Sequence, residues 1–168
     1  MTLNYENETD TLLDLQPESE ETLAERVIEA GLEDVDCPYD AQVSLLITDD
    51  EGIRELNRQF RGIDAPTDVL SFPMREGEDP EIAKQLPLGD IAISIPTAMR
   101  YVENCHHKDR INENEMAPLT NTWSLLDELT FLIIHGTLHC LGYDHAEPEE
   151  EKIMRAKEKE WMMKVLEG

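Results

Sequence analysis

The sequence predicts a single α+β domain over residues 1–168, in which a small mixed sheet of three to four strands packs with about five helices. Short aliphatic runs that suit strands alternate along the chain with longer segments of helical periodicity. The chain has 168 residues, the usual length of one domain, and its longest apolar stretches are far too short to span a bilayer.

Residues 1–40 are predicted to form an acidic region of strand and helix. A helix follows Ser19 and carries apolar residues at helical spacing through Leu23 and Val27. Gly31 is expected to end this helix, because glycine is the residue that most often closes a helix.

The next elements are a strand, a short helix and a second strand. The alternating apolar residues of 41–48 predict the first strand. Asp49 or Asp50 is expected to cap the short helix, because a carboxylate accepts hydrogen bonds from the free amides of the first turn. The second strand covers residues 68–72 and is closed by Pro73.

A polar loop is predicted over residues 77–85, followed by a strand over 88–95. Pro96 then opens a helix that runs toward His106, since proline suits the first turn of a helix.

The carboxyl-terminal third is predicted to contain an exposed insertion, a buried helix and a final helix. The insertion covers residues 112–121. The buried helix begins at Trp123 or Ser124, and residues 129–134 at its centre are apolar on every side. Pro148 opens the final helix.

The chain is strongly acidic, with 38 Asp and Glu against 14 Lys and Arg and a formal net charge of −24. Half of this excess lies in residues 1–40, which hold 13 acids and one base. Such a charge argues against a protein that coats nucleic acid through a broad basic face, and against docking on an anionic membrane. The exception is residues 54–75, where four arginines face three acids.

The cysteines and the amino terminus predict a cytoplasmic protein. Cys37, Cys105 and Cys140 are odd in number and form no CxxC pair, a pattern typical of free thiols in a reducing compartment. Cys140 is expected to be a small buried hydrophobe. The first ten residues have neither the basic nor the apolar region of a secretory signal.

Residues 135–145, HGTLHCLGYDH, predict a metal site. His135 and His139 are four residues apart, so on a helix their Cβ atoms lie on one face about 6 Å from each other. Gly142 can end the helix and turn the chain back, so that His145 supplies a third nitrogen. Three nitrogen ligands and one open position describe a catalytic zinc site.

Two further observations limit this prediction. The spacing equals that of metzincin proteases, but Gly136 stands where those enzymes carry the glutamate that acts as general base, which argues against a peptidase. Glu128 lies two helical turns before His135, too far along the helix to act in place of that missing glutamate. His106 and His107 lie among charged residues and are expected in a solvated loop.

Three blocks of the sequence resemble the YbeY family of bacterial rRNA-maturation endoribonucleases. They are HGTLHCLGYDH, LNRQFRGIDAPTDVLSFP at 56–73 and LGDIAIS at 88–94, in the order that the family has them. The resemblance covers roughly residues 40–166 and is highly specific.

The resemblance implies one zinc ion at the end of a buried helix, held by His135, His139 and His145. It also implies a catalytic role for Arg61, which matches the family's important arginine. The implied activity is zinc-dependent hydrolysis of single-stranded RNA in late maturation of the small ribosomal subunit, at the 3′ end of 16S rRNA, and in ribosome quality control. Ribosomal proteins and the small subunit are implied partners, whereas DNA and membranes are not.

The residues leave the mechanism partly open. Arg61 is a candidate for gripping the phosphate, since guanidinium is planar and always charged, and its alternative is a surface salt bridge with Asp64 or Asp68. The nucleophile is a water or the RNA 2′-hydroxyl. Three acids are candidates for accepting a hydrogen bond from the histidine ring nitrogens that do not bind the metal: Asp68, Asp90 and Asp144. The stripe formed by Arg54, Arg58 and Arg61 is either a phosphate track or a solvated helix face.

Two other functions remain open. One is a zinc hydrolase of another substrate class, such as peptides or small esters. The other is a non-catalytic ribosome-assembly factor with a structural zinc, which normally needs a fourth protein ligand. Cys140 is the nearby thiol, but on a helix it points about 100° away from His139, its neighbour.

Overall fold

The computed structural model describes residues 1–9, 19–35, 41–74, 87–104, 107 and 123–167. The polar loop expected at 77–85 and the insertion expected at 112–121 lie outside these residues. Cys37, Cys105 and His106 lie outside them as well.

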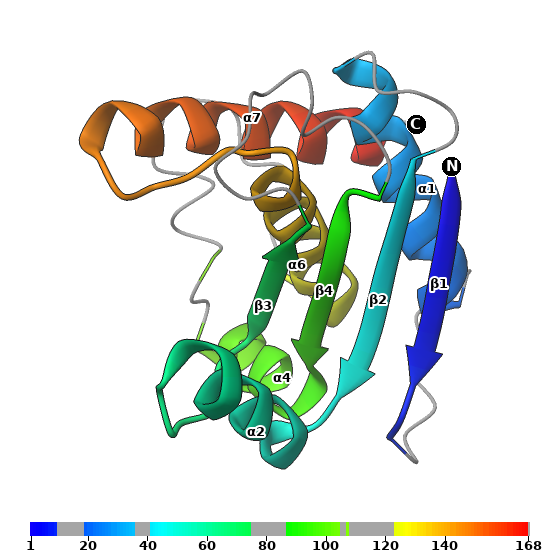
Figure 1. The fold of residues 1–168 in the computed structure, drawn as a ribbon. Coiled ribbons are helices and arrows are strands. Elements are labelled where there is room, and N and C mark those ends of the chain that lie inside the picture. Colours follow the sequence, from blue (N-terminus) through cyan, green and yellow to red (C-terminus); the bar gives the residue numbers. More distant parts are fainter. Residues whose placement is uncertain (10–18, 36–40, 75–86, 105–106, 108–122, 168) are drawn as a thin grey trace.

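One mixed sheet of four strands organises the fold (Figure 1). The strands are β1 (Thr2–Asn7), β2 (Gln42–Thr48), β3 (Val69–Pro73) and β4 (Gly89–Ser94). Their order across the sheet is β1-β2-β4-β3, with β1, β2 and β4 parallel and β3 antiparallel to β4. The predicted α+β class with three to four strands is therefore confirmed.

Five helices accompany the sheet in the described part of the chain: α1 (Glu20–Asp34), α2 (Asp50–Arg61), α4 (Ile95–Glu103), α6 (Leu125–Cys140) and α7 (Pro148–Glu167). Figure 1 shows α1 and α6 behind the sheet, α7 across one end, and α2 and α4 at the other end, where β2 and β4 finish. No helix among the described residues is long and apolar enough to cross a membrane.

Helix α6 is the central helix of the core. Twelve of its sixteen residues are buried, as the apolar centre of its sequence predicts. Its first turn is fixed by a capping box in which the side chains of Ser124 and Asp127 each accept a hydrogen bond from the other's backbone amide. A buried helix with a fixed start holds its side chains in defined positions.

The amino-terminal region contains the predicted strand and helix, but the helix ends at a different residue from the one expected. Helix α1 does not end at Gly31 but continues to Asp34. The glycine at this position makes room for Trp161 of α7, since a Cβ here would lie 2.3 Å from the indole ring. The strand β1 has no strong hydrophobic pattern of its own. It pairs with β2 at the edge of the sheet, and only every second residue is partly buried.

Two tight helix ends position the residues around α2. The Asp49 side chain accepts a hydrogen bond from the Gly52 amide, so Asp49 is the cap that the sequence predicts as one of two candidates. Gly62 ends α2 with a φ of 71°, a left-handed conformation that favours glycine. The chain then turns back and enters β3.

Candidate metal centre and a buried polar network

The structure brings the three motif histidines together at the end of α6. His135 and His139 lie on one face of the helix with their Nε2 atoms 3.2 Å apart. The His145 ring is 5.1 Å from the His139 ring and 5.7 Å from the His135 ring, centroid to centroid. One ring nitrogen from each of the three lies within 4.8 Å of the others.

The turn after α6 places His145. The Gly142 amide donates to the His139 carbonyl and the Tyr143 amide donates to the Leu138 carbonyl, the two bonds of a Schellman helix end. Gly142 has a φ of 100°, which a residue with a side chain adopts only with strain. The glycine turns the chain back toward the helix, as its place in the motif predicts.

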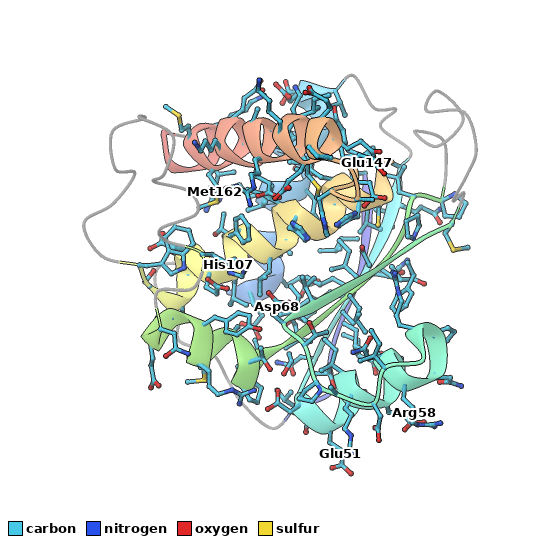
Figure 2. The ribbon with its side chains drawn as sticks, turned by 90° about the vertical axis from the view of Figure 1, so that its left-hand side faces the viewer. Glu51, Arg58, Asp68, His107, Glu147 and Met162 are labelled. Carbon is cyan, nitrogen blue, oxygen red and sulfur yellow. The ribbon has the colours of Figure 1, made fainter. Side chains whose placement is uncertain are left out.

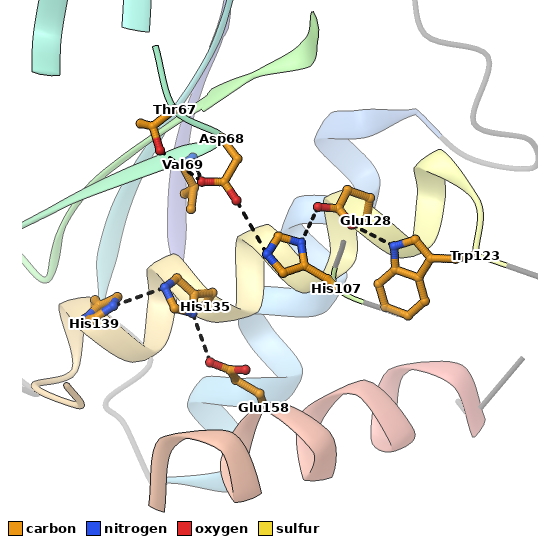
Figure 3. A network of polar contacts seen from close by, with 9 residues as sticks. All are labelled: Thr67, Asp68, Val69, His107, Trp123, Glu128, His135, His139 and Glu158. Atoms are coloured by element: carbon orange, nitrogen blue, oxygen red, sulfur yellow. Dashed lines mark hydrogen bonds and ion pairs between the residues drawn. The ribbon is translucent and has the colours of Figure 1, made fainter. Parts of the chain in front are cut away.

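A buried glutamate of α7 fixes the orientation of His135. Glu158 is 1% exposed, and its Oε1 lies 2.9 Å from His135 Nδ1 (Figure 3). A carboxylate on Nδ1 keeps the proton there and directs Nε2 toward the other two histidines, the usual arrangement behind a metal-bound imidazole. The sequence alone does not reveal Glu158, because it lies 23 residues beyond His135 in an acidic helix that carries no motif.

The three aspartates expected behind the histidines have other surroundings. Asp144 Oδ1 accepts a hydrogen bond from the His145 amide, as a turn residue does. Asp90 lies near the Cys140 thiol, whose pKa is raised first by burial and then by the Asp90 charge. Asp68 faces His107 rather than a residue of the motif.

The electrostatics suit a cation. Burial, together with the neighbouring His135 and His145 rings, lowers the pKa of His139 to about 4. His139 is therefore neutral at pH 7, with a lone pair available for a metal. Tetrahedral ligands at the usual zinc–nitrogen distance are about 3.3–3.4 Å apart, and the 3.2 Å between the two Nε2 atoms is close to this value. The residues fit a divalent metal.

Cys140 is not placed to join them. Its side chain is 2% exposed and lies on the sheet side, where a Cβ added to Gly89 would be 2.9 Å from its Sγ. Burial raises the pKa of the thiol to about 12, so it carries its proton at neutral pH. The predicted reading of Cys140 as a small buried hydrophobe is confirmed.

A second polar network lies at the other end of the same α6 face (Figure 3). Glu128 is fully buried and binds two donors: His107 Nδ1 lies 2.5 Å from its Oε1, and Trp123 Nε1 donates to its Oε2 at 2.7 Å. His107 Nε2 lies 3.7 Å from Oδ2 of Asp68, whose Oδ1 accepts from the Val69 amide.

This network corrects the expectation that His107 lies in a solvated loop, because His107 is 5% exposed and packs 4.4 Å from the Phe131 ring. The charged sequence around it gave no sign of the long-range partners that bury it. Asp68, His107 and Glu128 also bring ligand atoms within 4.8 Å of one another. Since both Glu128 oxygens already bind N–H donors, we interpret the network as a structural link between β3 and the start of α6 rather than as a second metal site.

The three arginines of α2 are not equivalent. Arg54 forms a bidentate pair with Asp64, and Arg58, which projects outward in Figure 2, pairs with Glu55. All four side chains are more than half exposed, as on a solvated helix face.

Arg61 differs from them, and it pairs with neither Asp64 nor Asp68. Its Nη2 donates to the Ser71 carbonyl at 2.7 Å, and its guanidinium carbon lies 5.8 Å from the centre of the Phe72 ring. Among the described residues no carboxylate forms an ion pair with Arg61. The alternative of a salt bridge with Asp64 or Asp68 is therefore wrong, and the charge of Arg61 remains available to a ligand.

The fold and site define a small α+β protein with a candidate three-histidine metal centre. The family model described as Endoribonuclease YbeY matches residues 4–166, and the chain belongs to this family of RNA-cleaving hydrolases.

Individual members of this family are similar to the chain over most of its length. The Endoribonuclease YbeY of Lachnoclostridium phytofermentans is 34% identical over 95% of this chain and 94% of its own. That of Pelotomaculum thermopropionicum is 47% identical over 72% of this chain and 70% of its own. The solution structure of a Thermotoga maritima protein, 29% identical, covers 98% of this chain and 89% of its own with a TM-score of 0.56.

Proposed function

We propose that the chain, residues 1–168, works as one domain and is a zinc-dependent endoribonuclease specific for single-stranded RNA. The observation that carries the proposal is the cluster of His135, His139 and His145, whose ring nitrogens converge within 4.8 Å. Family membership supports RNA as the substrate. Three protein ligands leave one position for water or substrate, as catalytic zinc sites do.

The residues divide the work. His135, His139 and His145 would hold the zinc ion, which would supply Lewis-acid chemistry and acidify water at the site. Glu158 holds His135 in the tautomer that offers Nε2. Arg61 binds the phosphate, because it carries no ion-pair partner among the described residues and guanidinium binds phosphate oxygens in a bidentate manner.

The cellular role follows the family. We propose that the chain acts in the cytoplasm in late maturation of the small ribosomal subunit, at the 3′ end of 16S rRNA, and in ribosome quality control. Its net charge of −24 favours ribosomal proteins with basic faces as partners, and disfavours DNA and anionic membranes.

Cleavage assays test the activity. The purified chain is incubated with single-stranded RNA, duplex RNA and casein, each with and without a metal chelator. We expect cleavage of single-stranded RNA that the chelator abolishes and that added zinc restores. Casein cleavage would instead indicate a zinc hydrolase of another class, and bound zinc without RNA cleavage would indicate an assembly factor.

Arg61→Ala separates phosphate binding from metal binding. Loss of a charge-assisted contact is expected to lower RNA cleavage about 10- to 100-fold while zinc content is unchanged. Arg54→Ala is the matched control, because Arg54 is on the same helix but is paired with Asp64. Equal activity of the two variants would remove Arg61 from the mechanism.

A further inference from the structure

An exposed aromatic pair lies where α2 approaches β3. Phe60, in the last turn of α2, is 60% exposed, and its ring lies 5.3 Å from the Phe72 ring at an interplanar angle of 60°. Ile63 and Met74, two or three residues further along each segment, are also more than half exposed. Several large apolar side chains exposed on two adjoining segments are typical of a contact site rather than of a plain surface.

The charge around this pair is positive in an acidic protein. Arg61 lies over Phe72, whereas the nearby acids Asp64 and Glu55 are neutralised by Arg54 and Arg58. The guanidinium charge also offsets the negative end of the α2 dipole. An apolar ring beside a cation suits a ligand that is both flat and anionic.

The pair lies at the edge of the sheet, beside a strand that also packs against α6, the helix that carries His135 and His139. Phe72 meets Phe60 on the α2 side, and the alternation of a strand directs Val69 and Ser71 to the opposite side, where Val69 packs on the core that contains α6. β3 is an edge strand, and Arg61 binds its Ser71 carbonyl. Arg61 and Phe60 therefore lie against a strand that packs on the helix of the candidate metal centre.

We propose that Phe60 and Phe72, with Arg61 beside them, form a nucleobase-stacking subsite for single-stranded RNA. This inference rests on the proposed function and adds a binding site outside the metal centre. Aromatic side chains bind bases of any sequence by stacking, and an adjacent arginine binds the phosphate between them. A duplex has no unstacked base to offer, so the subsite selects single strands.

An indole at position 60 reports stacking directly. The chain's own Trp123 and Trp161 are 8% and 1% exposed, so Phe60→Trp introduces the solvent-exposed fluorophore. The zinc-loaded variant is mixed with an RNA octamer in a stopped-flow instrument and read before cleavage. We expect saturable quenching by single-stranded RNA and little by a duplex of the same length. No quenching while the octamer binds would overturn the subsite.

Side-chain variants test its energy. Phe60→Ala and Phe60→Leu are expected to weaken binding of the octamer about 5- to 100-fold, and Phe60→Tyr to keep it, because stacking needs an aromatic ring. Met99→Ala, which truncates a 50% exposed side chain on α4, is the control. Wild-type affinity in Phe60→Leu would overturn stacking, and would indicate a purely apolar contact.

The result also separates this inference from the proposed function. A wild-type chain that neither binds nor cleaves RNA overturns both. If the wild type cleaves single-stranded RNA and all Phe60 variants bind the octamer with wild-type affinity, the subsite alone is overturned.

Discussion

At the scale of single residues, the candidate metal centre depends on imidazoles that stay neutral and point the right way. Burial and the two neighbouring rings keep the pKa of His139 at about 4, and Glu158 fixes the tautomer of His135. The convergence of His135, His139 and His145 was predictable because the three residues are close in sequence. Glu158 and His107 were not, since their partners are 23 and 21 residues away in the chain.

Glu158→Gln tests the orienting carboxylate. Glutamine keeps the shape but loses the charge that holds the proton on His135 Nδ1, so zinc affinity is expected to fall about 10- to 100-fold. Competition with a chromophoric chelator measures the affinity. Glu160→Gln, an exposed position on the same helix, is the control. Equal affinity in both variants would mean that Glu158 does not support the site.

At the scale of elements, the hydrophobic pattern predicted the elements that are buried. It misled where contacts with an element far away in the sequence determine the structure. β2, β4 and α6 were predicted because their apolar runs are long and buried. β1 is stabilised by pairing rather than by its own pattern. Gly31 looks like a helix end, but its absent side chain makes room for Trp161, a contact across 130 residues that no local pattern contains.

Asp50 joins two elements, and its titration gives a pH dependence. Its side chain accepts hydrogen bonds from Ser94 and Thr97 and pairs with Arg100, linking α2 to α4. Burial raises the pKa of Asp50, but these contacts outweigh it and lower the pKa below the usual value. The stability contributed by the ionised Asp50 is therefore complete above about pH 4 and is lost as the pH falls through its folded-state pKa.

Asp50→Asn is expected to lower the free energy of unfolding by about 1–3 kcal/mol at pH 7. The difference from the wild type should shrink as the pH falls below about 4 and through the folded-state pKa of Asp50, because the wild-type side chain then loses its charge. Urea denaturation at several pH values measures it. A difference that stays constant down to pH 3 would contradict the assigned role of the charge.

At the scale of the whole molecule, the net charge of −24 limits how the protein handles RNA. The acidity argues against binding RNA through a broad basic surface, and under the proposed function it leaves Arg61 and the candidate metal centre to bind phosphate. Family membership shows that strong acidity is compatible with an RNA-cleaving fold. The charge therefore defines the mode of binding rather than the class of substrate.

A shallow salt dependence follows from this. Each phosphate neutralised on a single strand contributes about −0.7 to the slope of log affinity against log salt, so few contacts predict a slope between about −1 and −2. Arg61→Ala is expected to make the slope about 0.7 less steep, and Arg54→Ala to leave it unchanged. Fluorescence anisotropy from 50 to 300 mM salt, roughly the range over which such slopes are read, measures it. A slope steeper than about −4 would reveal a basic surface that the account lacks.

The proposed function requires that His135, His139 and His145 hold one metal ion. Metal content per chain, measured by mass spectrometry on the wild type and on His139→Ala, tests it most directly. We expect one zinc per chain in the wild type and almost none in the variant, with circular dichroism showing that both are folded. A folded His139→Ala chain that retains one zinc would contradict it.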